Sequence, residues 1–544
     1  MILSRFMNCW VMLEKIVRRY NVMEYGILSI LPPILAIVLA IATRQVIISL
    51  FIAVWLGATF LHANPIDGFF RSIDTYVLES AADPWYAAIL IFTMIIAGTL
   101  GLVTKAGGAH AIAEALSKKA KTVRGGMLSA WLMGMIVFFD DYASCLIAGN
   151  TARPVTDKLK ISREKLSYVI DSTAAPIATI ALISTWIGFE LGVIGEGYAA
   201  IGMEEAPVYL IFLQSIPYRF YSIFAIALVL ILSITMKDYG SMYDAEVRAR
   251  KEGKLLRDGA VPLSATDTEV LQPAKETPLR WFNFVVPVLV ILVATFVGLY
   301  IEGGGTEPGV SLTDAFGNAD SSVVLLWSSS LGALVTLVMV LAQRIVPLQE
   351  SIDTIINGAK SVFPALIILV LAWALSYISG ELGAADYLVG LVEAAGISAA
   401  MLPLLIFLLS CFMAFAMGTS WGTMGIVTPL AIPVAFALGG EPFLIPTLAA
   451  VLTGAIFGDH CSPISDTTIL SSTGAGADHI DHVRTQIPYA VTGAVVAAVF
   501  GFIPAGLGVP PIISIIVGIV VLIIFVKLVG KSTATVEDID AAGK

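Results

Sequence analysis

Five aspartates stand inside, or at breaks in, long apolar stretches of this chain: Asp140, Asp141, Asp171, Asp459 and Asp466. An aspartate at the centre of a membrane costs about 2.5 to 3.5 kcal/mol, so five facing lipid would cost roughly 12 to 18 kcal/mol. They therefore face either the membrane interface or a polar cavity, where water, protons or cations compensate their charge. Two partly desolvated carboxylates close together can hold a proton near neutral pH, which lets H+ and Na+ compete for the same oxygens.

The adjacent pair Asp140 and Asp141 follows Phe138-Phe139 and precedes Tyr142. Neighbours on a regular helix point about 100° apart, so both carboxylates face one site only where the backbone unwinds. Two interpretations follow. The pair is either a cation and proton site, or a hairpin end whose carboxylates cap a helix N-terminus in an aqueous vestibule.

Two further strings, 171–176 and 458–466, place an aspartate and hydroxyl groups just before a proline. The proline interrupts the helical hydrogen bonds and frees carbonyl oxygens, and a small hard cation binds carboxylate, hydroxyl and carbonyl oxygens. Asp459, Ser462 and Asp466 share one helical face if their segment stays helical. A capped loop without a ligand is the alternative. The predicted cation- or proton-binding residues, with Na+ on the five aspartates, are Asp140, Asp141, Asp171, Ser172, Thr173, Asp459, Ser462, Ser465 and Asp466.

Three other groups of polar residues are candidates of a different kind. The Gly-rich string 418–425 carries hydroxyls that could coordinate a substrate, although such strings also serve close helix packing. The predicted residues of this substrate hairpin are Thr419, Ser420, Thr423 and Asn150. Asn150 and Glu190 are weaker candidates of the same type, and the preferred interpretation of each is a satisfied polar residue of the bundle. His479 and His482 could form a cytoplasmic pH sensor or metal site, or could simply be solvated in a charged loop.

Composition places all of these residues in a membrane protein. Of 544 residues, 58% are hydrophobic and 13% are charged, and the mean hydropathy is +0.89. A soluble protein has nearly twice that charged fraction, and apolar stretches near 20 residues are long enough to cross a bilayer. Disordered, fibrous, disulfide-rich and nucleic-acid-binding classes are excluded, the last because the net charge of −10 leaves no basic surface. The four cysteines, Cys9 among them, form no C-x-x-C pair and are expected to be small membrane residues.

The expected fold is an all-α polytopic membrane protein of about 11 to 13 membrane segments. Polar or Gly-rich breaks interrupt the stretches 126–150, 399–438 and 446–475. Such breaks are tolerated at membrane depth only where protein or a water-filled cavity satisfies the freed backbone groups.

The two halves of the chain align with each other as an internal repeat. Pro84 falls opposite Pro364, and Tyr142 falls opposite Trp421, at offsets of 280 and 279 residues. Loops rich in Lys and Arg in the first half have counterparts with none in the second, which predicts that equivalent loops lie on opposite sides of the membrane. The expected architecture is therefore two inverted-topology repeats, each with a re-entrant hairpin.

The expected domains follow from this repeat. They are an N-terminal extension (1–26), a first membrane repeat (27–236), a charged cytoplasmic linker (237–280), a second membrane repeat (281–507), and a final transmembrane helix with a C-terminal tail (508–544). The linker balances eight basic with eight acidic residues and is predicted to be a connector rather than a folded domain.

The strings Phe138-Phe-Asp-Asp-Tyr142, Gly418-Thr-Ser-Trp-Gly422 and Gly458-Asp-His-Cys-Ser-Pro-Ile-Ser-Asp466 resemble the NhaC-type sodium/proton antiporter family. The resemblance covers about residues 25 to 510. It implies a multi-pass exchanger of a bacterial or archaeal cell membrane, related to an ion-transporter superfamily with inverted repeats and two re-entrant hairpins. The family also includes relatives similar to organic-acid and amino-acid carriers, so the resemblance implies a mechanism more securely than a substrate.

The leading hypothesis is Na+/H+ antiport by alternating access, with no cofactor, with lipid, Na+ and H+ as partners, and with a homodimer left open. The alternative on the same scaffold is Na+- or H+-coupled transport of a small organic solute, such as an amino acid, malate or lactate. The absence of arginine near the breaks argues mildly against a dicarboxylate. An intramembrane aspartyl protease is a third and remote class, because an enzyme gives no reason for a duplicated, inverted hairpin.

Overall fold

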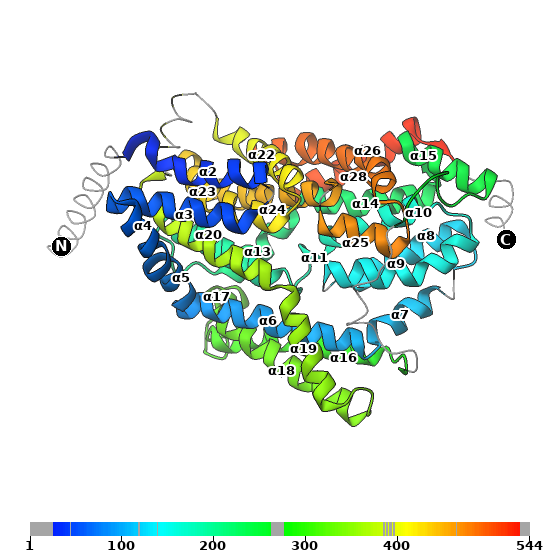
Figure 1. Cartoon of the computed structure of the whole chain (residues 1–544), viewed down its shortest axis with the longest axis horizontal. Helices are drawn as coiled ribbons and strands as arrows, with labels where there is room; N and C mark the ends of the chain where they lie inside the picture. The colour runs from blue at the N-terminus through cyan, green and yellow to red at the C-terminus, as the bar shows by residue number, and fades with distance from the viewer. Residues whose placement is uncertain are drawn as a thin grey trace.

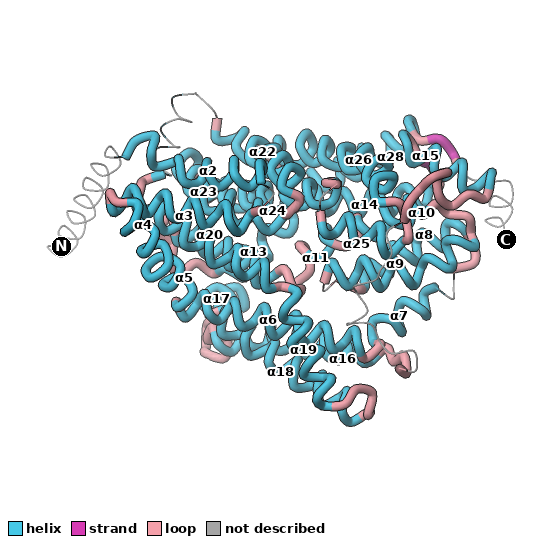
Figure 2. The backbone as a smooth tube through the Cα atoms, viewed as in Figure 1, coloured by secondary structure: helices cyan, strands magenta, loops and turns pink. Residues whose placement is uncertain are grey.

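The computed structural model describes residues 25–533, apart from residue 44, residues 118–119, 139 and 263–276, most of 385–397, and residue 464. Helices make up nearly all of this part (Figure 1). Its one strand ladder pairs β1 (Lys237–Asp238) with β2 (Lys531–Ser532), beside α15 in Figure 2. Most of the predicted N-terminal extension, with Cys9, lies outside the described residues.

The elements before and within the linker are η1 (Gly26–Ile30), α2 (Leu31–Thr43), α3 (Val46–His62), α4 (Pro65–Arg71), η2 (Ser72–Val77), α5 (Leu78–Ala82), α6 (Pro84–Lys105), α7 (Gly108–Ser117), α8 (Val123–Ile136), α9 (Asp141–Lys158), α10 (Arg163–Asp171), α11 (Ala175–Ala178), α12 (Ile187–Ala199), α13 (Val208–Ser215), η3 (Ile216–Tyr218), α14 (Phe220–Thr235), α15 (Gly240–Val247) and η4 (Arg248–Glu252). Those after it are α16 (Phe282–Glu302), α17 (Leu312–Asn318), α18 (Ser321–Ala342), α19 (Leu348–Ser361), α20 (Phe363–Glu381), η6 (Ala399–Met401), α22 (Leu402–Met417), α23 (Ser420–Gly439), η7 (Glu441–Phe443), α24 (Leu444–Cys461), α25 (Asp466–Ala475), α26 (His479–Val496), η8 (Ala497–Phe502), α27 (Ile503–Gly506) and α28 (Pro511–Val529).

The all-helical, multi-pass class predicted from composition is confirmed. Within the described residues, nine helices are long and apolar enough to cross a bilayer, or ten if the pair α13–η3 and α14, bent by 48°, counts as one span. This is fewer than the predicted 11 to 13, because several stretches counted as spans are broken into shorter helices and α2 and α3 are short. On α28, large apolar side chains such as Ile512, Ile516 and Ile524 remain exposed, as expected of a surface that contacts lipid.

The three predicted breaks are present. They separate α8 from α9 at residues 137–140, α22 from α23 at 418–419, and α24 from α25 at 462–465. Gly418 ends α22 with φ +70°, a backbone conformation that glycine adopts without a steric penalty. The chain is also interrupted around the proline of the string 171–176, where α10, α11 and α12 follow one another as separate helices.

Helices of the two halves of the chain pack against each other. The alignment of Pro84 with Pro364 pairs α6 with α20. Helix α6 packs against α18 and α19 of the second half, while α20 packs against α3, η2 and α5 of the first. Helix α9 packs against α25, and α23, which the alignment of Tyr142 with Trp421 pairs with α9, packs against α12. Each half therefore holds elements of the other in a reciprocal arrangement.

The described part of the linker is more structured than the sequence predicts. Residues 237–262 include β1, α15 and η4, and α15 packs against α10 and α26. Lys165 at the start of α10 forms a buried ion pair with Asp238. Arg248 pairs with Glu164 at 2.8 Å. These buried pairs fix the linker to the ends of membrane helices, which charge balance along the sequence could not reveal.

Candidate functional site

The breaks of the two halves meet inside the bundle. Trp421, in the first turn of α23, lies with its ring centroid 4.6 Å from that of Trp186 and 4.7 Å from that of Phe189. Trp186 directly precedes α12, so this aromatic contact joins the tip of the α22–α23 hairpin to the broken segment between α11 and α12. In Figure 1 the α22–α23 pair lies in the left half of the view and the α8–α9 pair in the right half.

Two buried carboxylates lie at this junction. Asp459, in the last turn of α24, is 4% exposed; its Oδ2 accepts a hydrogen bond from the Ser420 hydroxyl (3.0 Å) and its Oδ1 accepts one from the Ser465 hydroxyl (2.6 Å). Asp141, at the start of α9, is 3% exposed, and its Oδ2 finds no hydrogen-bond partner among the described residues. The two charges are close enough to interact electrostatically. Each half thus contributes one carboxylate to a region rich in oxygen atoms.

Asp140 and Asp466 lie at the edge of this region. Asp140 is half-buried and accepts a hydrogen bond from the Thr185 hydroxyl at 3.0 Å. Asp466 is exposed at the start of α25 and accepts one from the Tyr142 hydroxyl at 3.3 Å. Among the described residues, no three His, Cys, Asp or Glu side chains converge as they would around a metal ion. A sodium ion bound here would therefore rely on hydroxyl and carbonyl oxygens beside one or two carboxylates.

Asp171 belongs to a second polar cluster, at the end of α10. It is 1% exposed, and its Oδ2 accepts hydrogen bonds from the Gln486 amide (2.6 Å) and from His482 Nε2 (3.1 Å). The interpretation of His482 as a solvated loop residue is wrong: it is fully buried on α26. Helix α26 begins at His479, and His482, about one turn later, points into the bundle. His479 itself lies near the surface, 2.8 Å from the Pro463 carbonyl oxygen.

Most of the predicted hydroxyl ligands have other partners in this conformation. Ser172 lies 2.8 Å from His460 Nε2. Three hydroxyls donate to backbone carbonyl oxygens instead: Thr173 to Val169 (2.8 Å), Thr423 to Thr419 (3.0 Å) and Ser462 to Phe415 (2.8 Å). Asn150 is half-buried on α9, and Thr419 directly precedes α23.

The predicted common face of Asp459, Ser462 and Asp466 is not formed. Helix α24 ends at Cys461, and the chain is extended at both Ser462 and Ser465 before α25 begins. The unwound turn brings Ser465, rather than Ser462, onto the Asp459 carboxylate. The break frees backbone groups as expected, but it also rotates the residues that follow.

Sequence reasoning missed a buried arginine beside a break. Arg219, at the entrance to α14, is fully buried and donates to Glu190 Oε2 (2.7 Å) and to the Thr179 hydroxyl (2.8 Å) and carbonyl. The expectation that no arginine lies near the breaks is therefore wrong. Glu190 is satisfied by this pair, as expected, and its carboxylate neutralises the guanidinium. One signal in the sequence could have indicated this ion pair: Glu190 is an acid inside one apolar stretch, and Arg219 is a base directly before another.

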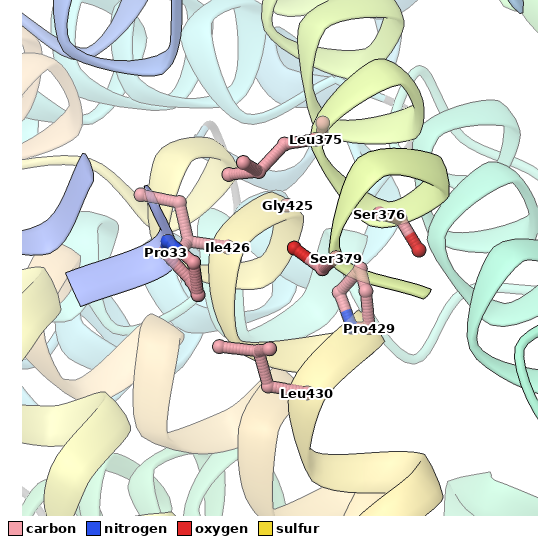
Figure 3. A pocket seen from close by; sticks show the side chains of 9 residues that line it. Pro33, Leu375, Ser376, Ser379, Gly425, Ile426, Pro429 and Leu430 are labelled. Atoms are coloured by element: carbon pink, nitrogen blue, oxygen red, sulfur yellow. The ribbon is translucent and has the colours of Figure 1, made fainter. Parts of the chain in front are cut away.

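A small cavity of about 10 Å³ lies beside α23, shortly after Ser420. It has room for about one water molecule. Gly425 and Ser379 line it, and in Figure 3 the Ser379 hydroxyl points toward α23. Pro429 removes the hydrogen bond that the Gly425 carbonyl would accept in a regular helix. This part of α23, next to the hairpin tip, therefore lacks one helical hydrogen bond and lies beside a small cavity.

Broken membrane helices that carry buried carboxylates at their ends are typical of secondary transporters rather than enzymes. The Na+/H+ antiporter family matches residues 177–506. An uncharacterised protein of Haemophilus influenzae is 34% identical over 530 residues, which cover 94% of this chain and 98% of that protein. The chain belongs to the Na+/H+ antiporter family and is a multi-pass membrane transporter.

Two further proteins are similar over less of the chain or in fold only. The malate-2H+/Na+-lactate antiporter of Bacillus subtilis is 35% identical over 161 residues, which cover 28% of this chain and 33% of that one. The solved structure of Neisseria gonorrhoeae MtrF, described among antimetabolite efflux pumps, has a TM-score of 0.51 at 12% identity and covers 81% of this chain and 84% of that one. The latter shows a common fold.

Proposed function

We propose that this protein exchanges Na+ for H+ across a cell membrane, and that Asp141 and Asp459 hold the transported Na+ in turn with a proton. The observation that carries the proposal is a pair of buried carboxylates, one from each half, at the junction of three broken helices. Neither carboxylate has a Lys or Arg partner within the described residues. A buried charge without a fixed partner needs a proton or a mobile cation.

The hydrogen-bond partners suit this role. Oδ2 of Asp141 accepts no hydrogen bond from the described residues, so it is open to a cation or a proton. Ser420 and Ser465 on the Asp459 carboxylate offer hydroxyl oxygens, which a hard cation accepts as ligands. Ser420 begins α23 and Ser465 precedes α25. Movement of either helix would therefore change how many oxygen atoms coordinate a cation bound at Asp459. That dependence is what alternating access requires.

The proposal includes two inverted repeats, 27–236 and 281–507, joined by a cytoplasmic linker at 237–280. The reciprocal packing of α6 and α20 supports the repeat, and the distribution of Lys and Arg supports the inversion. Single cysteines at the exposed residues Glu307 and Lys254 test it in a cysteine-free background. Glu307→Cys should react with an impermeant thiol reagent only from outside and Lys254→Cys only from inside; reaction of both from one side, or from the reverse sides, contradicts the orientation that the distribution of Lys and Arg predicts.

Proton release by inside-out vesicles tests the exchange itself. Vesicles energised to an acid interior should release protons when Na+ is added, because inward Na+ movement drives H+ outward. Asp141→Asn and Asp459→Asn should abolish that response, since an amide carries no negative charge for the ion. Glu307→Gln, an equivalent change in an exposed loop, should respond like the unaltered protein. Absence of Na+-dependent alkalinisation by the unaltered protein contradicts the proposal.

The second candidate is coupled transport of an organic acid on the same scaffold. It is favoured by the partial likeness to a malate/lactate antiporter and by the aromatic rings of Trp186, Phe189 and Trp421 at the junction. The neutralised state of Arg219 disfavours direct recognition of a carboxylate there. Uptake of labelled malate or lactate, with and without a Na+ gradient, separates the two candidates.

A further inference from the structure

One buried carboxylate lies outside the proposed Na+ site. Glu196, in the last turn of α12, is 7% exposed. Its Oε2 accepts a hydrogen bond from the Tyr86 hydroxyl of α6, and the Ser376 hydroxyl of α20 donates to the same carboxylate. Among the described residues, no Lys or Arg pairs with it. Glu196 therefore resembles the proposed Na+-binding carboxylates and differs from Glu190: its charge needs a proton or a mobile cation.

An aromatic stack fixes the position of this carboxylate. The Tyr86 ring lies on Trp373 of α20, with the ring centroids 4.0 Å apart and the planes at 21°. Trp373 is 1% exposed, and its Nε1 donates to the Gly192 carbonyl oxygen (3.2 Å), one turn before Glu196 on α12. Both donors to the carboxylate are hydroxyls, which can also accept, so Glu196 keeps hydrogen-bond partners whether it is ionised or protonated. These partners suit a proton, whereas a metal cation would need further oxygen ligands.

Helix α12 connects Glu196 to the central junction. It begins directly after Trp186, which contacts Trp421 at the tip of the α22–α23 hairpin. At about 1.5 Å per residue, Glu196 lies about 15 Å farther along the helix than Trp186. The loop that follows α12, residues 200–207, contains no Lys or Arg, which predicts that this end of the helix faces outside.

Acidic side chains surround the outer end of α12. The charge of Asp83, which caps α6, acts on both Glu196 and Tyr86, and the charge of Glu204 acts on Tyr86. Glu441, between α23 and α24, acts on the last turn of α12. In the described part of the chain, the other helices packed on α12, which are α13, α20 and α23, bring no charged side chain that acts on Glu196. The combined negative potential attracts protons and cations from outside to this end of the bundle.

Two hydroxyls of α20 extend from this carboxylate toward the proposed Na+ site. Ser379, one turn after Ser376, is buried, and its Oγ has no hydrogen-bond partner among the described residues. In Figure 3 the Ser379 hydroxyl points toward α23 and the Ser376 hydroxyl points the opposite way. A water molecule in the small cavity that both serines line with Gly425 would satisfy Ser379. Gly425 lies about 7.5 Å along α23 from Ser420, the donor to Asp459, so these hydroxyls lead from the outer carboxylate toward the central one.

We propose that Glu196 is the proton-binding residue on the outer side of this transporter, through which protons pass between the external solution and the carboxylates Asp141 and Asp459. The inference rests on the proposed exchange of Na+ for H+ and adds where the proton enters or leaves the protein.

The test measures Na+/H+ exchange in uniformly oriented proteoliposomes while the pH is varied on one side at a time. Glu196→Gln can still accept from Tyr86 but cannot titrate. Exchange should fall at least about tenfold, and the remaining rate should depend on the inner pH but no longer on the outer pH. Exchange of labelled for unlabelled Na+ should be retained, because it needs only the Na+ site. Glu205→Gln, an exposed acid in the loop after α12, is the matched control and should behave like the unaltered protein.

Two further variants separate titration from packing. Glu196→Asp keeps a titratable group and should recover the dependence on outer pH. Tyr86→Phe removes a donor that favours the ionised carboxylate, so the outer pH at which exchange is half-maximal should rise. A fall in that pH contradicts the role of Tyr86 as a donor to Glu196.

Two results overturn the inference. The first is full exchange by Glu196→Gln with an unchanged dependence on outer pH. The second is a loss of Na+ self-exchange in Glu196→Gln as complete as in Asp459→Asn, since Glu196 would then be required for Na+ binding or for the fold. Failure of the proposed exchange itself appears in the unaltered protein instead, as Na+ self-exchange without proton movement.

Discussion

Glu246 should give the protein a pH-dependent component of stability. It lies on α15, outside the membrane spans, is 1% exposed, and accepts hydrogen bonds from the N–H (2.8 Å) and the hydroxyl (2.7 Å) of Ser162, the residue that caps α10. Burial, followed by the nearby charge of Asp238, raises the pKa of Glu246 from 4.5 to about 7, and the charge of Lys165 acts in the opposite direction. One buried lysine thus faces two buried carboxylates.

The magnitude follows from proton linkage. A rise in the pKa of Glu246 from 4.5 to about 7 means that the folded protein binds this proton about 3 kcal/mol more tightly than the unfolded chain does. Below pH 4.5 both states are protonated, and the full contribution to stability is present. As the pH rises toward 7 the unfolded chain releases its proton first, so the free energy of unfolding falls through this window by about 3 kcal/mol in total. The contribution is lost once the pH has passed the folded-state pKa.

Glu246→Gln isolates this component, because the amide oxygen still accepts from Ser162 but cannot titrate. The midpoint of thermal denaturation in detergent should fall less steeply between pH 4.5 and 7 in the variant than in the unaltered protein, and the variant should be the more stable of the two above pH 7. Glu252→Gln, an exposed position on the same linker, is the matched control and should follow the unaltered protein. Parallel curves for Glu246→Gln and the unaltered protein would refute the reasoning.

Two further variants test the packing that positions the site. Arg219→Met leaves Glu190 buried without its base, and should cost about 3 to 5 kcal/mol in stability, with Glu190→Gln in the same chain recovering part of the loss; equal denaturation midpoints for the single and the double variant would contradict this. A Cβ at Gly149 would lie 2.7 Å from the backbone of Gly474, so Gly149→Ala should lower the denaturation midpoint, whereas Gly380→Ala, which meets nothing within 4 Å, should leave it unchanged or raise it.

The sequence predicts the breaks because their cause is local. Glycines, prolines and charged residues inside apolar stretches disrupt helical hydrogen bonds wherever the chain goes, so 137–140, 418–419 and 462–465 could be placed within a few residues. What the breaks do to later residues is not local. Helix α24 unwinds after Cys461, and the extended backbone at Ser462 and Ser465 decides which of the two serines reaches Asp459. Periodicity carries no information once a helix has ended.

The other differences between the predicted and the observed site come from contacts between elements that are far apart in the sequence. Ser420 and Asp459 lie 39 positions apart, and His482 and Asp171 lie 311 apart, so neither hydrogen bond has a signature in sequence spacing. The charges around His482 suggested a solvated loop. Many of those charges instead bind the linker, as Arg257 binds Asp481 at 3.0 Å, which leaves the histidine to face inward.

The presence or absence of a fixed counter-charge identifies candidate transport residues among the buried acids better than their positions in apolar stretches of the sequence do. Glu190 lies as deep in the bundle as Asp141, yet Arg219 compensates its charge permanently, so it has no use for a mobile ion. Asp141 and Asp459 have no such partner in the described part of the chain. An acid inside an apolar stretch is therefore a candidate transport residue only when the folded chain supplies no fixed counter-charge. Because a counter-charge such as Arg219 arrives from a distant helix, that distinction is a property of the packed bundle, and the sequence alone could not separate Glu190 from the aspartates on this ground.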